Sequence, residues 1–184
     1  MIYICFMDDV KELKVTFGGH IRMIGFTLLI YAFFVFIAVY SCIYSLKPKL
    51  LVLIFMIVIP FVFLILPVLY VHYQYSKCSD EIFYKLNKNV SITQTSSSGE
   101  KIFNVDEFEQ FKFVLTKSKL VKTPSKMMFS DYNYLKLKLK TGEELTFTCL
   151  YSSDLYTLFT SYFPDIPITT EGVFYPNISE MDFE

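Results

Sequence analysis

Two long stretches that contain no charged residue and no histidine constrain this chain more than any other feature. They run from Met23 to Leu46 and from Leu50 to Val71, and only three residues separate them. Each stretch exceeds the ~20 apolar residues that cross a hydrocarbon core of ~30 Å at 1.5 Å per residue. Because the connector is so short, the two helices must be antiparallel. The sequence therefore predicts a two-helix transmembrane hairpin over residues 23–73, with helices at 23–46 and 50–71.

The second stretch favours insertion into a membrane strongly. Leu, Ile, Val and Phe fill 18 of its 22 positions, which is worth about 5 to 11 kcal/mol on an insertion scale. Pro60 and Pro67 would break a soluble helix, whereas in a bilayer neighbouring helices satisfy the carbonyl groups that a proline frees. Since the two prolines lie on roughly one face, we expect a kink. That kink is either purely structural or a moving hinge.

Positive charges flank the predicted hairpin unequally. Six lie beside its two ends and two lie in its turn. The six are Lys11, Lys14, Arg22, Lys77, Lys85 and Lys88, and the two are Lys47 and Lys49. Because cytoplasmic loops carry the excess of Lys and Arg, we expect a multi-pass protein of the cell (inner) membrane with both termini in the cytoplasm.

The remaining residues divide into three parts. Residues 1–22 are expected to form an N-terminal cytoplasmic arm in which Val10 to Phe17 is a strand or an extended segment. Residues 76–164 are long enough for one small β-rich cytoplasmic domain with its own core. Residues 165–184 contain five acids and no base, which predicts a loosely ordered acidic tail, although a strand-like piece of it could still dock on the domain.

A β-hairpin is the clearest element of the predicted domain. Leu135, Leu137 and Leu139 alternate with lysines, a Thr-Gly turn follows, and apolar residues alternate again up to Cys149. This period of two predicts one buried face and one solvent-exposed face. Lys136 and the lysines that alternate with the leucines would then be exposed to solvent. Before this hairpin, three short segments between residues 80 and 105 predict a meander, and Phe111 to Val121 is also expected to be extended.

One amphipathic helix is expected after this hairpin. Leu155, Leu158, Phe159 and Tyr162 form a single apolar stripe. Ser152 or Ser153 would cap its start, and Pro164 ends it.

The order of these elements resembles a known family. Two tightly connected apolar helices are followed by about seven short strands and one helix, and the segment from Tyr134 to Thr148 followed by the helix of residues 152–163 carries the likeness best. In this respect the chain is similar to bacterial membrane-anchored proteins with a pleckstrin-homology-like (PH-like) domain, including the YcxB-like family. The resemblance implies a bent sheet or small barrel with a C-terminal helix on the cytoplasmic face, and no enzymatic activity.

Motifs for catalysis, cofactors or metals are not found in the sequence. No phosphate-binding loop, dinucleotide fingerprint, zinc-protease motif or nucleophile elbow occurs. His20 and His72 flank the apolar stretches without a carboxylate or cysteine at ligand spacing, so interfacial packing or hydrogen bonding is the better interpretation. The four scattered cysteines indicate reduced thiols. We therefore expect no enzyme, no cofactor and no metal.

Lysines concentrate in one part of the predicted domain. Residues 112–140 hold eight lysines against one acid, Asp131. On a domain tethered at a bilayer, such lysines would meet the anionic inner leaflet at about 1 kcal/mol each. The residues expected to contact lipid headgroups are Lys117, Lys119, Lys122 and Lys126. The alternative is that the lysines occupy exposed strand faces and discourage edge-to-edge pairing.

Two functions from different classes follow. The first is a membrane-anchored binding or regulatory module that recognises a protein segment or anionic lipid headgroups. The second is a subunit of an oligomeric pore, holin-like assembly or transporter in which the helices are the working part. Few polar side chains lie inside the helices, which weighs against ion conduction. The expected partners are the lipid bilayer and a protein partner or second copy, but not nucleic acid, because the chain has no arginine after Arg22.

Overall fold

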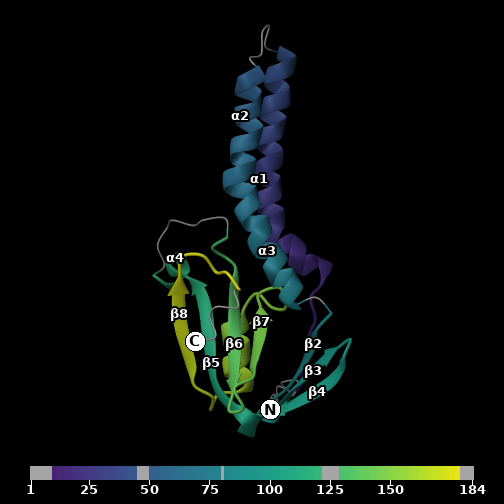
Figure 1. Ribbon diagram of the computed structural model, residues 1–184, viewed down its shortest axis with the longest axis vertical. Coiled ribbons are helices and arrows are strands. Elements are labelled where there is room, and N and C mark those ends of the chain that lie inside the picture. The colour runs from purple at the N-terminus through teal and green to yellow at the C-terminus, as the bar shows by residue number, and fades with distance from the viewer. Residues whose placement is uncertain (1–9, 45–49, 80, 122–128, 179–184) are drawn as a thin grey trace, which may run out of the picture.

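A computed structural model describes residues 10–44, 50–79, 81–121 and 129–178. Two long helices project from one end of a β domain built of two four-stranded sheets (Figure 1). The architecture agrees with the predicted combination of a helical hairpin and a mainly-β domain, but the predicted C-terminal helix is followed by one more strand.

The first sheet contains β1 (Val10–Leu13), β2 (Phe83–Asn87), β3 (Ser91–Ser96) and β4 (Gly99–Asn104) in that order. All its pairings are antiparallel, which confirms the predicted meander for β2 to β4. The difference lies in β1, which pairs with β2 so that Leu13 is opposite Tyr84. Leu13 is buried in the core. The predicted arm (1–22) and the predicted domain (76–164) thus each contribute a strand to one sheet, and the hairpin is inserted between two neighbouring strands.

The second sheet has the order β7 (Glu144–Thr148), β6 (Asn133–Leu139), β5 (Phe108–Thr116) and β8 (Ile168–Val173). The predicted β-hairpin is present as β6 and β7, and its turn uses Gly142 at a φ of 88°, which glycine adopts without steric cost. β8 comes from the predicted acidic tail and pairs in parallel with β5. Part of that tail is therefore ordered, because the edge of β5 offers it a full row of backbone partners.

Shorter elements complete the domain. The 3₁₀ turn η2 (Val105–Glu107) links the sheets, and α4 (Lys117–Leu120) follows β5 where an extended chain was expected. The helix α5 (Leu155–Tyr162) is present as predicted, but Asp154 caps it by accepting a hydrogen bond from the Thr157 amide at 3.1 Å. Neither of the two serines expected as caps does so.

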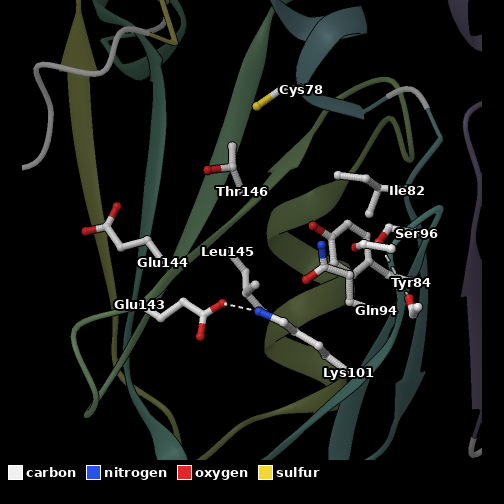
Figure 2. Close-up of a pocket in the computed structure, with 12 residues that line it drawn as sticks. Cys78, Ile82, Tyr84, Gln94, Ser96, Lys101, Glu143, Glu144, Leu145 and Thr146 are labelled. Atoms are coloured by element: carbon white, nitrogen blue, oxygen red, sulfur yellow. Dashed lines mark hydrogen bonds and ion pairs between the residues drawn. The ribbon is translucent and has the colours of Figure 1, made fainter.

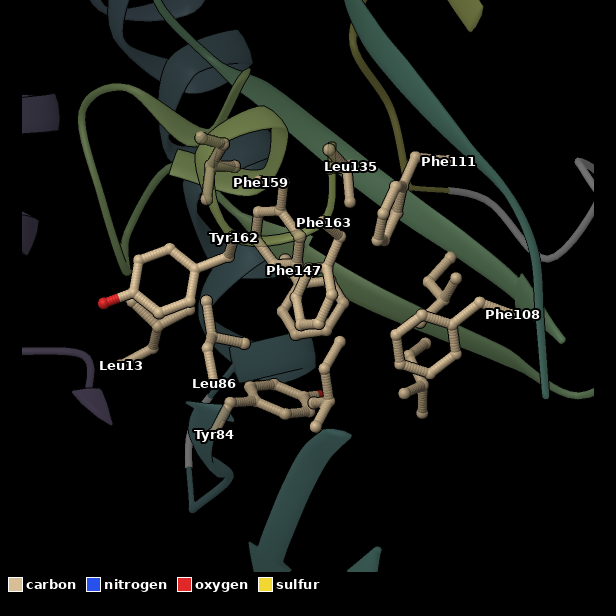
Figure 3. Close-up of a cluster of buried hydrophobic side chains, with 14 of the residues drawn as sticks. Leu13, Tyr84, Leu86, Phe108, Phe111, Leu135, Phe147, Phe159, Tyr162 and Phe163 are labelled. Carbon is tan, nitrogen blue, oxygen red and sulfur yellow. The ribbon is translucent and has the colours of Figure 1, made fainter. Parts of the chain in front are cut away.

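The main core lies between the two sheets and α5, and aromatic rings dominate it (Figure 3). Phe147 of β7 is central, since its ring centroid lies 4.6 Å from that of Phe159 in α5 and 4.4 Å from that of Tyr84 in β2. Offset and edge-to-face pairs of this kind add about 0.5–1.5 kcal/mol each beyond the area they bury. These contacts join both sheets to the helix in one core.

The projecting helices are longer at their domain ends than predicted. The first is α1 (Phe17–Tyr44), and the second runs from α2 (Leu50–Pro60) through the π-helical turn η1 (Phe61–Ile65) into α3 (Leu66–Ser79). Both are long and apolar enough to cross a membrane, and only 11% and 22% of the residues in their most apolar windows are buried. A core helix of a soluble protein would be mostly buried, which these two helices are not.

A π-helical turn lies between the two prolines, at the position where a kink was expected. Pro67 has no amide hydrogen, and immediately before it the amide of Leu66 donates to Phe61, five residues back. A single π-helical turn inside an α-helix is one of the recognised causes of a change in helix direction.

Candidate functional site

One side of α3 is built into the β domain along its length. Val68, Val71 and Tyr75 are fully buried or nearly so and pack on the outer face of the second sheet. The Tyr75 ring lies 5.1 Å from the Tyr132 ring and 6.1 Å from the Tyr134 ring. A second apolar core therefore holds the hairpin against the domain, and we refer to this region as the hairpin junction.

The chain's two histidines meet at the hairpin junction. His20 of α1 and His72 of α3 share a hydrogen bond of 2.9 Å between Nδ1 and Nε2, respectively. The Nδ1 atom of His72 lies 3.0 Å from the hydroxyl of Tyr132, which precedes β6. Burial raises the pKa of Tyr132 well above its usual value, so this hydroxyl stays protonated. Three segments distant in sequence are thus joined by one row of hydrogen bonds, which agrees with the hydrogen bonding expected for these histidines.

Two further contacts fix α1 to the end of β7. The Arg22 guanidinium donates to the carbonyl oxygen of Cys149 at 2.6 Å. Gly19 lies so close to the segment after β7 that a Cβ there would be 2.8 Å from the carbonyl oxygen of Leu150.

Burial raises the pKa of the Cys149 thiol to about 11. Within the described residues, no group of three or more His, Cys, Asp or Glu side chains is placed to hold a metal ion.

The predicted headgroup lysines are divided between described and undescribed residues. Lys117 and Lys119 lie in α4 and are exposed, and α4 is at the end of the domain from which the helices leave (Figure 1). Lys119 is 4.0 Å from Asp131. Lys122 and Lys126 lie outside the described residues. The structure therefore brings two of the four lysines to the end of the domain that a membrane would face.

Other lysines of the same segment do not belong to an open positive surface. Lys112 pairs with Glu171 at 2.6 Å, and Lys138 pairs with Glu109 at 3.0 Å. The prediction that Lys136 faces water is wrong, because only 4% of its side chain is exposed and it lies 3.6 Å from Glu144. The sequence missed this because α3 covers the outer face of β6, and the period of two gives no sign of a second covering layer.

A cleft of about 270 Å³, lined by polar and apolar side chains, opens between the two sheets and was not predicted. Figure 2 shows Tyr84, Gln94 and Ser96 of the first sheet facing Leu145 at the start of β7. A Lys101–Glu143 ion pair of 3.2 Å joins the two sheets at this cleft. It contains no cluster of groups that would indicate catalysis, and no spacing in the sequence could have placed these residues together.

The comparison with protein families is decisive for the β domain. Residues 10–156 match the family model described as PH domain. The chain belongs to the PH domain family. The matched stretch begins at the first residue of β1 and ends in α5, so it includes the strand that precedes the hairpin. No match was found among curated proteins or among solved structures.

Proposed function

We propose that this PH domain protein is a membrane-anchored binding module. The α1 and α2–α3 helices span a bilayer, and the β domain lies at its surface to recognise a protein segment or anionic lipid headgroups. The pairing of β1 with β2 carries this proposal, because it joins both domain ends of the hairpin to one sheet, as a hairpin that enters and leaves a membrane on one side requires. The proposal also takes up the resemblance to the bacterial YcxB-like proteins, and it includes no enzymatic activity.

The charge distribution supports an orientation with the domain and both termini in the cytoplasm. Six Lys and Arg residues lie beside the domain ends of the hairpin and two in its turn, and the excess of positive charge normally stays inside. Anionic lipids of the inner leaflet would then face Lys117 and Lys119. At about 1 kcal/mol for each lysine near the surface, this pair would hold the end of the domain against the bilayer.

Hydrogen exchange in lipid nanodiscs tests the headgroup contact. The full-length protein is placed in discs of neutral lipid and in discs that contain anionic lipid. We expect slower amide exchange over residues 117–120 in the anionic discs, and loss of that protection in the variant Lys117→Glu/Lys119→Glu. Lys85→Glu/Lys88→Glu, which changes the same charge near the first sheet, is the matched control and should keep the protection. Equal exchange in the two kinds of disc would rule out lipid recognition by α4.

The membrane placement has its own test. The protein should stay with membranes after an alkaline wash, and its β domain should resist protease added outside intact cells. Release by the wash would show that the helices do not span a bilayer, and external digestion of the domain would reverse the proposed orientation.

A further inference from the structure

The chain after β8 returns to the second helix of the hairpin. The hydroxyl of Tyr175 donates to the carbonyl oxygen of Pro67 at 2.7 Å. The ring of Phe129 supports this arrangement, with its centroid 4.8 Å from the Tyr175 ring and 6.5 Å from the Phe174 ring. Pro67 precedes the end of α3 at Ser79 by 12 residues, which is about 18 Å along a helix. This C-terminal segment therefore reaches the level of the predicted apolar stretch.

An apolar groove lies between that segment and α3. Its volume is about 600 Å³, and nearly all of its lining surface is apolar. The lining residues are Leu66, Pro67, Leu69, Tyr70, Tyr73 and Tyr175. Tyr70 and Tyr73 are more than half exposed, and Phe174 beside the groove is 70% exposed. Tyrosine rings are enriched where a helix passes from hydrocarbon to headgroups, so this exposed apolar site has the chemistry of a bilayer boundary.

We propose that the groove binds the upper part of an acyl chain of a membrane phospholipid, so that Phe174 and Tyr175 contact the bilayer together with α3. This inference rests on the proposed function, because it requires the hairpin to lie in a membrane. The groove is continuous with the outward apolar surface of α3, which favours lipid over a protein partner.

The neighbouring helix α4 suits the headgroup of the same lipid. Gly172, two residues before Phe174, packs so closely on α4 that a Cβ there would lie 2.7 Å from Leu120 and 3.3 Å from Lys117. The lysines of α4 and the C-terminal segment are therefore parts of one packed surface. A phospholipid with its acyl chain in the groove and an anionic headgroup toward α4 would contact both the apolar groove and the lysines.

The chain contains no tryptophan, so single tryptophans report lipid contact without background. Phe174→Trp is the probe, in nanodiscs whose phosphatidylcholine is brominated near the top of the acyl chains. Because interfacial side chains enter the headgroup–acyl boundary by about 5–10 Å, we expect these bromines to remove about half of the fluorescence or more. Ile102→Trp, at an exposed position on β4, is the control and should not be quenched.

Phe55→Trp, at an exposed position in α2, separates failure of this inference from failure of the proposed function. Quenching of Phe55→Trp without quenching of Phe174→Trp would overturn the lipid groove and leave the membrane hairpin intact. Phe55→Trp is also measured in nanodiscs whose phosphatidylcholine is brominated near the ends of its acyl chains. If those bromines do not quench Phe55→Trp either, the hairpin itself is not in the bilayer.

Occupancy of the groove is tested by native mass spectrometry of the detergent-released protein. The parent chain should retain one phospholipid. Leu69→Trp fills the groove and should lose that lipid, whereas Leu51→Trp, which adds the same bulk at an exposed position of α2 outside the groove, should retain it. Equal retention by Leu69→Trp and the parent would refute the site.

Discussion

His20 and His72 lie 52 positions apart in the sequence, and their ring nitrogens are 2.9 Å apart at the hairpin junction. Each histidine belongs to a different helix, and His72 continues the contact to Tyr132 of the β domain. These hydrogen bonds thus fix the positions of the two helix ends relative to each other and to the second sheet. A rotation of either helix would break at least one of these hydrogen bonds.

The two histidines should therefore be energetically coupled. His72→Ala removes the partner of both His20 and Tyr132, and we expect a loss of about 1–3 kcal/mol in the free energy of unfolding because polar groups remain unsatisfied. His20→Ala should cost less. In a double-mutant cycle measured by denaturant unfolding in detergent micelles, we expect a coupling of about 0.5 kcal/mol or more. Strictly additive effects would show that the bond contributes nothing to stability.

Two adjacent glycines at the start of α1 should respond oppositely to alanine. Gly19→Ala places a Cβ 2.8 Å from the backbone carbonyl of Leu150, and relieving such a clash costs roughly 1–3 kcal/mol. Gly18→Ala meets only the Thr16 hydroxyl at 3.7 Å, and a better helix former there gains up to about 1 kcal/mol. Thermal unfolding of the two variants checks this. Similar melting temperatures would mean that α1 does not pack on β7 this closely.

The buried lysine of β6 should matter more than its exposed neighbour. Lys136→Met removes the cation 3.6 Å from the Glu144 carboxylate, which is only 19% exposed, and we expect a loss of about 2 kcal/mol or more. Lys138→Met breaks an exposed pair with Glu109 and should cost less than about 1 kcal/mol. Urea unfolding compares the two. Adding Glu144→Leu to Lys136→Met should recover most of the loss, and no recovery would place the cause elsewhere.

Alkali should destabilise the domain in a defined pH range. The pKa of the Cys149 thiol is raised by burial from 9.0 to about 11. The stability from keeping it protonated is therefore complete below pH 9 and is lost as pH rises through 11. A shift of about two pKa units corresponds to roughly 3 kcal/mol. Unfolding between pH 8 and pH 11 should show a smaller pH dependence for Cys149→Ala, though not none, because burial also raises the pKa of Tyr84 and Tyr132. An unchanged slope would contradict the assignment.

Local patterns in the sequence were sufficient for much of this fold. The two charge-free stretches, the alternation through Leu135 to Cys149 and the stripe from Leu155 to Tyr162 each predicted the right element, because each pattern reports burial on one face of a single helix or strand. The resemblance to PH-like proteins agrees with the family match at residues 10–156.

The differences arise where burial depends on a second layer or a distant strand. No pattern in Val10–Leu13 reveals that its partner begins 70 residues later at Phe83. Lys136 looked exposed because the covering helix comes from a different part of the chain. The same reason explains which parts of the candidate site could be predicted. Lys117 and Lys119 were predicted as part of a charge cluster along the chain, whereas the histidine pair and the groove beside Tyr175 exist only through tertiary packing.

The insertion of the hairpin between β1 and β2 has a practical consequence for preparing a soluble form. Cutting the chain after the helices would remove Leu13 from the core and leave the edge of β2 without its neighbour, so such a fragment is expected to aggregate. Since Leu13 and Tyr84 are directly opposite one another, a short turn could join these strands in place of the helices. Removal of α3 would still expose the rings of Tyr132 and Tyr134, which pack on Tyr75. A water-soluble version therefore needs polar side chains in place of those two tyrosines.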